Sequence, residues 1–311
     1  MKAMRSVEGV VPVLVTPFKA DGEIDEGGLD RLIEFLIQRA VGGLWVLGTN
    51  SEDMNLSFRK RLTIANRVAA TVKGRVPILL GCSFYALDDS FDFIEATKQL
   101  DVDAYHFMPY HPLYSLDRLE WHYRAIADRA PKPVWGYSSA NWCRPVPPEF
   151  YERIKGHPNI AGVKFSSNNT VNCTKVISMQ EPGFQVLTAV VACFHSNLAL
   201  GVRGTTTSLA CPLPEAIIGQ YKAFRAGRFE ESLEMQRRFN AFQDALPKTL
   251  KADNFLPGAA EKYILSLRGV CEPHMSGYYR SANEAEQAEI RAALVKYGVL
   301  PESEAARVAA E

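Results

Sequence analysis

Lys164 and Tyr137 are the two residues of this chain whose positions suggest covalent chemistry. Lys164 lies in residues 160–165 (IAGVKF), an apolar run that is too short for a helix and is bounded by turn-forming residues. Burying an ammonium ion in such a strand is costly, so we expect a lowered pKa for Lys164 and a nucleophilic amine. Tyr137 ends a second apolar run, residues 133–137 (PVWGY). An amine and a phenol at the ends of neighbouring strands predict Schiff-base chemistry on a carbonyl.

Each of these two residues also has an ordinary structural interpretation. Lys164 could extend along a strand edge and keep its ammonium group in water. Tyr137 could be a core tyrosine whose hydroxyl has a hydrogen-bond partner. Residue type and local pattern leave both interpretations open at this point.

The composition restricts the class of protein. The chain has 311 residues, a formal net charge of zero, 47% hydrophobic and 23% charged residues, as in ordinary globular proteins. No basic stripe with interleaved aromatic residues is present, which argues against a nucleic-acid partner. Without an apolar stretch of about 18 residues or a signal-peptide pattern, we expect a cytoplasmic protein with no membrane segment. Six cysteines without CxxC spacing predict free thiols, and six histidines without ligand spacing predict no metal site.

Short apolar runs alternate with segments of helical periodicity along most of the chain. Eight such runs with helices between them favour a parallel sheet, since parallel strands need crossover connections. A repeat of this kind over roughly 210 residues predicts the (β/α)8 TIM barrel, an α/β fold. A doubly wound open sheet is the alternative, but its glycine-rich first turn is missing at residues 16–18. The runs are residues 10–15, 44–47, 76–80, 104–108, 134–137, 160–165, 184–189 and 204–208.

Beyond residue 213 the pattern changes to helices without strands between them. We therefore predict residues 1–225 as the barrel and residues 226–311 as a C-terminal helical region packed on it. The Ala/Glu-rich tail, residues 302–311, is expected to fray. The predicted helices at this end are residues 214–226, 229–246, 258–267 and 283–297.

Side chains at the C-terminal ends of the strands form the active site of a (β/α)8 barrel. Here they make a polar ring with one amine and no pair of carboxylates, which argues against glycoside hydrolysis. Residues 205–208, with Thr206 among them, are expected to line the pocket wall. The ring consists of Thr16, residues 48–52, Ser83, Tyr110, His111, Tyr137, Lys164, Ala189 and residues 205–208.

The turn at residues 48–52 (GTNSE) follows a predicted strand and precedes a predicted helix. Hydroxyl groups and backbone N–H groups at such a turn can hold a carboxylate. A polar turn that only caps the next helix is an equally good interpretation.

Five motifs of the chain occur in the order found in the dihydrodipicolinate synthase / N-acetylneuraminate lyase family, which the chain resembles from about residue 8 to residue 297. No single motif is specific, but the combination is. The resemblance implies a (β/α)8 barrel with a C-terminal helical extension, usually assembled as a homotetramer. It also implies a class I aldolase-type lyase that binds pyruvate as a Schiff base and needs no other cofactor. The motifs are residues 15–18 (VTPF), 48–52 (GTNSE), Tyr137, 162–164 (GVK) and 261–263 (EKY).

The resemblance also implies roles for individual residues. Lys164 matches the Schiff-base lysine of the family, and Tyr137 matches the tyrosine that shuttles protons. Thr49 and Asn50 match the pair that holds the carboxylate of a 2-oxo acid, with Thr49 relaying protons to Tyr137. The substrates are then a 2-oxo acid and an aldehyde.

Three departures from the family pattern bear on the substrate. His111 occupies the place of a second tyrosine that the synthases use across a subunit interface. Trp142 stands about where the synthases have an arginine that binds the second substrate, which argues against synthase activity in the lysine pathway. The lyases have acidic residues for sugar hydroxyls after the seventh strand, whereas residues 188–192 here (TAVVA) have none. We therefore expect His111 and Trp142 near a substrate that is shorter or more apolar than a sugar acid.

Three functions remain to be distinguished. The first is a lyase that reversibly splits a 2-oxo acid into pyruvate and an aldehyde. The second is a dehydratase or deaminase that uses the same imine to expel water or ammonia. The third is a non-catalytic small-molecule-binding relative, against which the retention of Lys164, Tyr137 and Thr49 together argues.

Overall fold

The computed structural model describes residues 4–139, 143–254, 256 and 258–310. Trp142, predicted to lie near the substrate, falls outside these residues.

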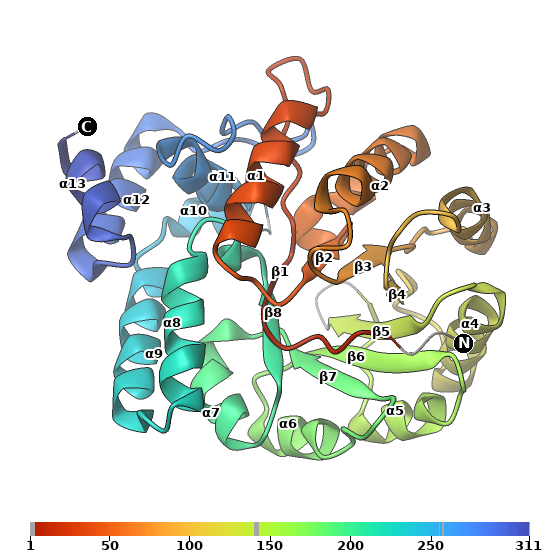
Figure 1. The fold of residues 1–311 in the computed structure, drawn as a ribbon. Coiled ribbons are helices and arrows are strands. Elements are labelled where there is room, and N and C mark those ends of the chain that lie inside the picture. Colours follow the sequence, from red (N-terminus) through yellow and green to blue (C-terminus); the bar gives the residue numbers. More distant parts are fainter. Residues whose placement is uncertain (1–3, 140–142, 255, 257, 311) are drawn as a thin grey trace.

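Eight parallel strands form a closed barrel at the centre of the molecule (Figure 1). Each strand pairs with its neighbours in the chain, and β8 pairs with β1. The last gap is closed between β1 and β2, where the amide of Leu14 donates to the carbonyl of Trp45 over 2.9 Å. The predicted (β/α)8 TIM barrel is therefore confirmed. The strands are β1 Gly9–Pro12, β2 Leu44–Val46, β3 Ile78–Gly81, β4 Ala104–Phe107, β5 Val134–Ser139, β6 Ile160–Ser166, β7 Gln185–Thr188 and β8 Gly204–Thr207.

Helices connect the strands and cover the outside of the barrel (Figure 1). Several begin at a side chain that accepts a backbone N–H of the first turn, as Ser57, Ser115 and Asn169 do. Short helical turns at the strand ends, among them η1 Thr49–Ser51 and η2 Asp53–Asn55, shape the barrel mouth. The outer helices are α1 Glu26–Gln38, α2 Phe58–Val72, α3 Leu87–Thr97, α4 Leu116–Arg129, α5 Pro148–Lys155, α6 Thr170–Ile177, α7 Phe194–Ala199 and α8 Pro214–Arg225.

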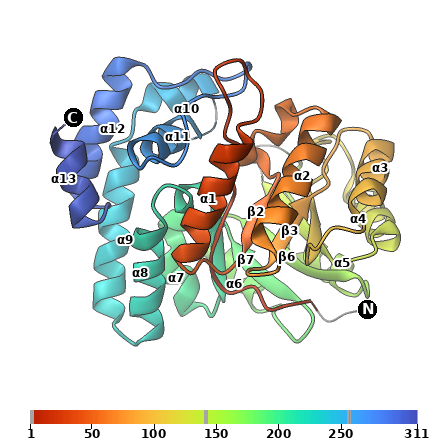
Figure 2. The same ribbon diagram turned by 45° about the horizontal axis from the view of Figure 1, so that its top comes forward.

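The remaining helices gather on one side of the barrel in both views (Figure 2). Two of them, α10 and α13, were not predicted from the sequence. The tail that we expected to fray forms α13, where Val308 is buried and Glu304 pairs with Arg268 over 2.6 Å. The predicted division at residues 225 and 226 falls at the C-terminal end of α8 and stays a prediction. The helices are α9 Phe229–Asp244, α10 Lys248–Asn254, α11 Gly258–Leu267, α12 Glu284–Tyr297 and α13 Glu302–Ala310.

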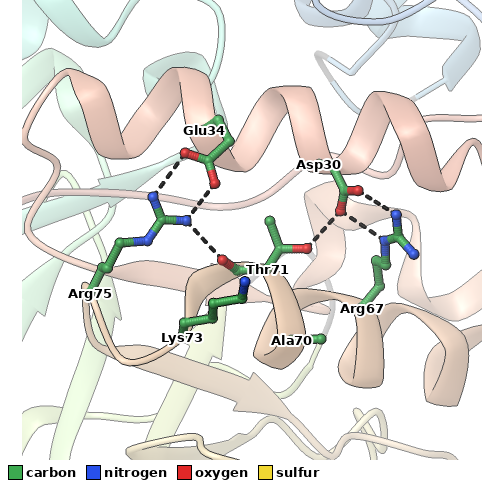
Figure 3. A pocket seen from close by; sticks show the side chains of 7 residues that line it. All are labelled: Asp30, Glu34, Arg67, Ala70, Thr71, Lys73 and Arg75. Carbon is green, nitrogen blue, oxygen red and sulfur yellow. Dashed lines mark hydrogen bonds and ion pairs between the residues drawn. The ribbon is translucent and has the colours of Figure 1, made fainter.

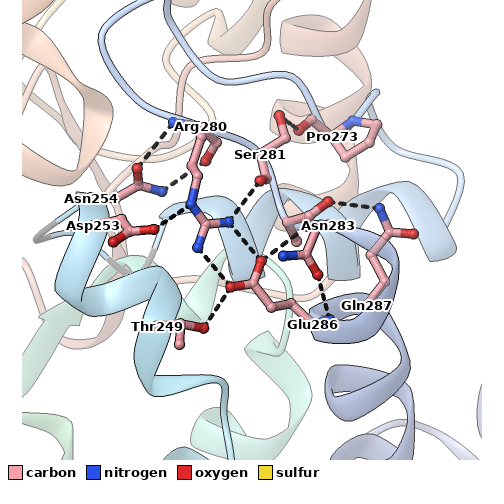
Figure 4. A network of polar contacts seen from close by, with 10 residues as sticks. Thr249, Asp253, Asn254, Pro273, Arg280, Ser281, Asn283, Glu286 and Gln287 are labelled. Atoms are coloured by element: carbon pink, nitrogen blue, oxygen red, sulfur yellow. Dashed lines mark hydrogen bonds and ion pairs between the residues drawn. The ribbon is translucent and has the colours of Figure 1, made fainter.

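A network of ion pairs centred on Arg280 ties the loop before α12 to α10 (Figure 4). The Arg280 guanidinium donates to Glu286 over 2.7 Å and to Asp253 over 2.6 Å. Thr249 donates to the same Glu286 carboxylate over 2.6 Å. These bonds fix α10 beside the barrel mouth, next to the strand ends that carry the predicted site.

Aromatic rings fill the lower interior of the barrel. The Trp45 ring stacks on His106 with centroids 4.1 Å apart and meets Trp135 edge to face at 6.2 Å. Gly162 makes room for these rings, because a Cβ there would lie 2.9 Å from Trp135 and 2.5 Å from the carbonyl oxygen of Gln185. The interior is therefore a packed core. Side chains from the C-terminal ends of the strands can approach one another over the layer of aromatic rings.

Candidate active site

Lys164 and Tyr137 lie side by side inside the barrel. The β5–β6 register pairs these two residues directly, so both side chains point to the same face of the sheet. The Lys164 Nζ atom lies 4.1 Å from the centroid of the Tyr137 ring and 5.0 Å from that of Trp45. Lys164 is 3% exposed, and this burial lowers its pKa to about 7, against the opposing effect of the Asp53 charge. The strand-edge interpretation of this lysine is therefore wrong.

The Tyr137 hydroxyl shares a hydrogen bond with the Thr49 hydroxyl, whose oxygen lies 3.2 Å away. Both side chains are buried. Burial raises the pKa of Tyr137, and the bond to Thr49 only partly opposes that shift. The phenol thus stays protonated at neutral pH and can pass a proton between Thr49 and a group bound at Lys164.

The turn that carries Thr49 is fixed mainly by Ser51. The Ser51 hydroxyl donates to the carbonyl of Leu14 over 2.6 Å and accepts the N–H of Gly48 at 3.1 Å. Thr16 donates to the carbonyl of Ser51 over 2.7 Å. These bonds of Ser51 join the ends of β1 and β2.

Asn50 reaches the C-terminal helices through a chain of hydrogen bonds. Its amide nitrogen donates to Ser208 over 2.7 Å, and the Ser208 hydroxyl donates to Glu261 of α11 over 2.6 Å. Burial raises the pKa of Glu261 to about 8, so this carboxyl is largely protonated at neutral pH. The bonding orients the Asn50 amide at the mouth of the barrel.

A fully buried ion pair between Glu52 and Lys262 completes the link between the turn and α11. The Lys262 ammonium also donates to the carbonyl of His274 over 2.9 Å, and the Ser276 amide donates to Glu52 over 2.8 Å. The motif at residues 261–263 therefore holds the GTNSE turn in place, because Lys262 pairs with Glu52 and Glu261 accepts the Ser208 hydroxyl that is bonded to Asn50.

Thr206 and His111 occupy different parts of the mouth. Thr206 pairs with Val11, a member of the inner cluster, and therefore faces the interior. Its buried hydroxyl oxygen has no hydrogen-bond partner among the described residues, so it is available to a ligand. The His111 ring bonds to the carbonyl of Tyr85 at 2.8 Å and stacks on Tyr114 at 4.4 Å, contacts that hold it at the rim.

Asp53, a buried carboxyl in the same interior, was not predicted from the sequence. Asp53 directly follows the GTNSE turn and is 0% exposed. Its Oδ2 atom accepts the hydroxyl of Tyr110 at 2.8 Å, and burial raises its pKa. The sequence shows an acidic residue directly after the GTNSE turn. The alternation of strand, turn and helix does not distinguish such a residue from an ordinary polar residue of the turn.

A cavity of about 790 Å³ opens beside Asn50 and Ser208, between the ends of β7 and β8 and helices α9–α11. Much of its wall is apolar, and two lysines, Lys248 and Lys251, belong to its lining. A volume of this size accommodates a small organic substrate. Its apolar residues are Ala189, Val190, Val191, Ala192, Leu209, Leu246, Pro247, Leu250, Ala252 and Ala260.

Within the described part of the chain, no three His, Cys, Asp or Glu side chains cluster as a metal would require. Over the same residues, no helix is long and apolar enough to cross a membrane. The six cysteines are free thiols.

Comparison with known proteins decides the family. The model of the dihydrodipicolinate synthetase family matches residues 6–296 of this chain. The chain belongs to the dihydrodipicolinate synthetase family. A 4-hydroxy-tetrahydrodipicolinate synthase of Persephonella marina is 25% identical over 297 residues, which cover 94% of this chain and 99% of the relative.

Solved structures show the same fold. YagE, a prophage protein of the dihydrodipicolinic acid synthase family from E. coli K12 whose crystal structure contains pyruvate, superposes with a TM-score of 0.87 at 22% identity. That match covers 95% of this chain and 100% of YagE. The N-acetylneuraminate lyase of Proteus mirabilis superposes with a TM-score of 0.85 at 21% identity, over 95% of this chain and 100% of the lyase. The predicted membership is confirmed, and the chain is an aldolase-type lyase of the dihydrodipicolinate synthetase family.

Proposed function

We propose that this lyase holds its 2-oxo acid as a Schiff base on Lys164 and reversibly splits it into pyruvate and an aldehyde. The observation that supports this role is the buried Lys164 amine, with its pKa lowered to about 7 and its nitrogen over the Tyr137 ring. A neutral amine attacks the keto carbon, and loss of water leaves an iminium. The iminium withdraws electrons as the C3–C4 bond breaks, and no cofactor beyond this covalent link is required.

We assign the proton transfer steps to Tyr137 and Thr49. Tyr137 protonates and deprotonates groups attached to the Lys164 nitrogen, and Thr49 reloads it through their shared hydrogen bond at 3.2 Å. Asn50 and Thr206 are assigned to the carboxylate of the 2-oxo acid. The Asn50 amide is oriented by Ser208, and the Thr206 hydroxyl is buried without a partner among the described residues.

The aldehyde part of the substrate is assigned to the cavity beside Asn50. Its valines at 190 and 191 stand where sugar-cleaving relatives would need polar groups, so a substrate with an apolar tail fits better. We propose that His111 contacts the substrate from the rim, and the corresponding role of Trp142 stays a prediction from the sequence. Rates of pyruvate release from aryl and polyhydroxylated 2-oxo acids test this: preference for the hydroxylated substrates contradicts an apolar tail.

The Schiff base itself is tested by borohydride reduction in the presence of pyruvate. We expect a permanent adduct on the peptide that contains Lys164, detected by its mass. An active preparation whose peptide stays unmodified would falsify the covalent mechanism.

Product analysis separates the lyase from a dehydratase or deaminase on the same scaffold. A panel of 2-oxo acids, assayed for pyruvate through a coupled NADH readout, should release pyruvate from at least one member. Products with an intact carbon chain would instead support elimination of water or ammonia.

We propose a homotetramer as the working assembly, following the family resemblance. Large apolar side chains remain exposed in the single chain, among them Leu113 at 91% and Tyr278 at 80%. Light scattering coupled to size-exclusion chromatography gives the mass of the particle, and a monomer would contradict this assignment.

A further inference from the structure

Asp53 is a carboxyl group of the site to which the proposed mechanism gives no task. The residue begins η2, directly after Glu52, whose φ of +62° turns the chain inward. One carboxyl oxygen, Oδ2, accepts the Tyr110 hydroxyl at 2.8 Å. The other, Oδ1, is buried and has no hydrogen-bond partner among the described residues. A buried carboxyl oxygen left in this way is expected to meet a ligand or a reacting group.

The Tyr110 side chain places this carboxyl in the barrel interior. Tyr110 packs in the same inner cluster as Trp45 and Tyr137, the rings that contact Lys164. The Asp53 charge acts directly on Lys164, where it opposes the lowering of the lysine pKa by burial. Asp53 and Lys164 therefore lie in the same buried interior, where the charge of the carboxyl acts on the pKa of the amine.

The Asp53 carboxyl is influenced by the backbone N–H of Met54 and by several charged or titratable side chains besides Tyr110. The Arg61 guanidinium attracts the carboxylate through space, but its described hydrogen bonds go to the carbonyls of Leu56 and Ser83. The groups that act on Asp53 or feel its charge are Arg61 of α2, Tyr110 after β4, Tyr137 of β5, Lys164 of β6 and Tyr279 before α12.

We propose that Asp53 is a further catalytic residue: it donates the proton that leaves with water when the Lys164 carbinolamine becomes an iminium, and it then balances the iminium charge. This inference rests on the proposed function, because it needs the covalent intermediate on Lys164. The inference assigns the loss of water to the Asp53 carboxyl, which is hydrogen-bonded to Tyr110 of the same chain.

The step balances in atoms and charge. The neutral Lys164 amine adds to the keto carbon, and the carbinolamine keeps one hydroxyl on that carbon. Protonated Asp53 gives its proton to this hydroxyl, the C–O bond breaks, and water departs. The site then holds a positive iminium and a negative carboxylate, so its total charge is the same as before. Burial supports the starting state, since it raises the pKa of Asp53 and lowers that of Lys164 toward their neutral forms.

The test is the rate of adduct formation in the full chain with pyruvate, measured by borohydride trapping and peptide mass. In Asp53→Asn the amide oxygen still accepts the Tyr110 hydroxyl, but the side chain can neither release a proton nor carry a charge. We expect the trapping rate to fall by about 10²-fold or more. The matched control is Asp92→Asn, the same change at an exposed residue of α3, which should trap at the wild-type rate.

The pH profile separates chemistry from a purely structural role of Asp53. Wild-type trapping should slow on the alkaline side as Asp53 loses its proton, and Asp53→Asn should lose that limb. Tyr110→Phe removes a hydrogen bond that favours the carboxylate form, so the alkaline limb should move to higher pH. This second variant decides the question if Asp53→Asn fails to fold.

Each outcome has a distinct meaning. A wild-type rate and profile in Asp53→Asn, or an unshifted limb in Tyr110→Phe, overturns the role of Asp53 and leaves the Schiff base on Lys164 intact. Absence of any adduct in an active wild-type protein overturns the proposed function and this inference with it.

Discussion

The barrel mouth and the groove between α1 and α2 differ in whether their charged side chains form ion pairs. The groove, of about 630 Å³, lies on the outside of the barrel (Figure 3). Its carboxylates are paired: Asp30 with Arg67 at 2.8 Å, and Glu34 with Arg75 at 2.8 Å. At the mouth, Lys164 is buried, and the described contacts give its ammonium no ion pair within hydrogen-bond distance.

The pKa directions show the difference in function. Hydrogen bonds from Arg67 and Arg75 lower the pKa values of Asp30 and Glu34, so these groups stay charged. Burial raises the pKa of Asp53 and lowers that of Lys164, so both move toward neutral forms. Groups whose charge is already stabilised hold two helices together, whereas groups kept near neutrality can exchange protons with a substrate.

Lys164→Met should have the largest effect. Without the amine, we expect no borohydride adduct and loss of essentially all activity. The same change should raise the free energy of unfolding, because the folded protein no longer holds a lysine whose pKa is lowered from 10.5 to about 7. The unfolded chain binds that proton more tightly, so the gain is greatest at pH 7 and below and vanishes above about pH 10.5.

Urea unfolding of both proteins at pH 7 and at pH 10 measures this gain. A variant that is less stable than the wild type at pH 7 would contradict the assignment of a costly buried amine.

Tyr137→Phe should lower kcat by roughly 10²–10⁴-fold, the usual contribution of a positioned proton carrier. Pyruvate should still bind, because the ring and its contact with Lys164 remain. Near-normal turnover would remove the tyrosine from the mechanism. Steady-state kinetics and calorimetric titration with pyruvate provide the two readouts.

Lys262→Met breaks the buried ion pair and leaves the Glu52 carboxylate alone in the interior. We expect a loss of about 3–5 kcal/mol in the free energy of unfolding. The double change with Glu52→Gln should recover part of that loss, since no buried charge then remains unpaired. Urea unfolding of the three variants measures the coupling; a single variant as stable as the wild type contradicts it.

The rate of adduct formation should rise with pH on the acid side. With a Lys164 pKa of about 7, protonation below that value removes the nucleophile. Between pH 6 and pH 7 the neutral fraction grows about fivefold, and the trapping rate should follow it. A rate independent of pH over this interval would show that the amine is already neutral at pH 6.

Arg67→Gln in the groove should have the smallest effect. Its ion pair with Asp30 is exposed to solvent, so the energy is screened by water and salt. We expect activity within about twofold of the wild type, and a slightly lower unfolding midpoint. A large loss of activity would mean that the groove is coupled to the barrel mouth.

Most elements of the barrel were predictable from the sequence, because strands buried on both faces appear as short apolar runs. The segments of helical periodicity between these runs likewise indicated the connecting helices, and Ser57 and Ser115 cap the starts of α2 and α4. Helix α10, seven residues long, has too few turns to show a periodic pattern. Helix α13 depends on contacts made elsewhere in the chain, including the bond from Arg268 to Glu304.

The candidate site divides in the same way. Lys164, Tyr137 and Thr49 could be proposed from the sequence because each lies at the end of an apolar run or in a family motif. Asp53 and the pairing of Glu52 with Lys262 could not, since their partners are 57 and 210 positions away. Contacts between residues so far apart in the sequence leave no local pattern from which they could be predicted.

The order of strands and turns along the chain was enough to predict the barrel and the place of its proposed nucleophile, because burial of a strand is a local property of its residues. Whether a given acid is paired or left with a free oxygen was decided only by the tertiary structure. The fate of its charge depends on which distant side chains close around it, as Tyr110 does around Asp53. The local sequence determines which chemical group a position offers. The packing around that group determines its protonation state.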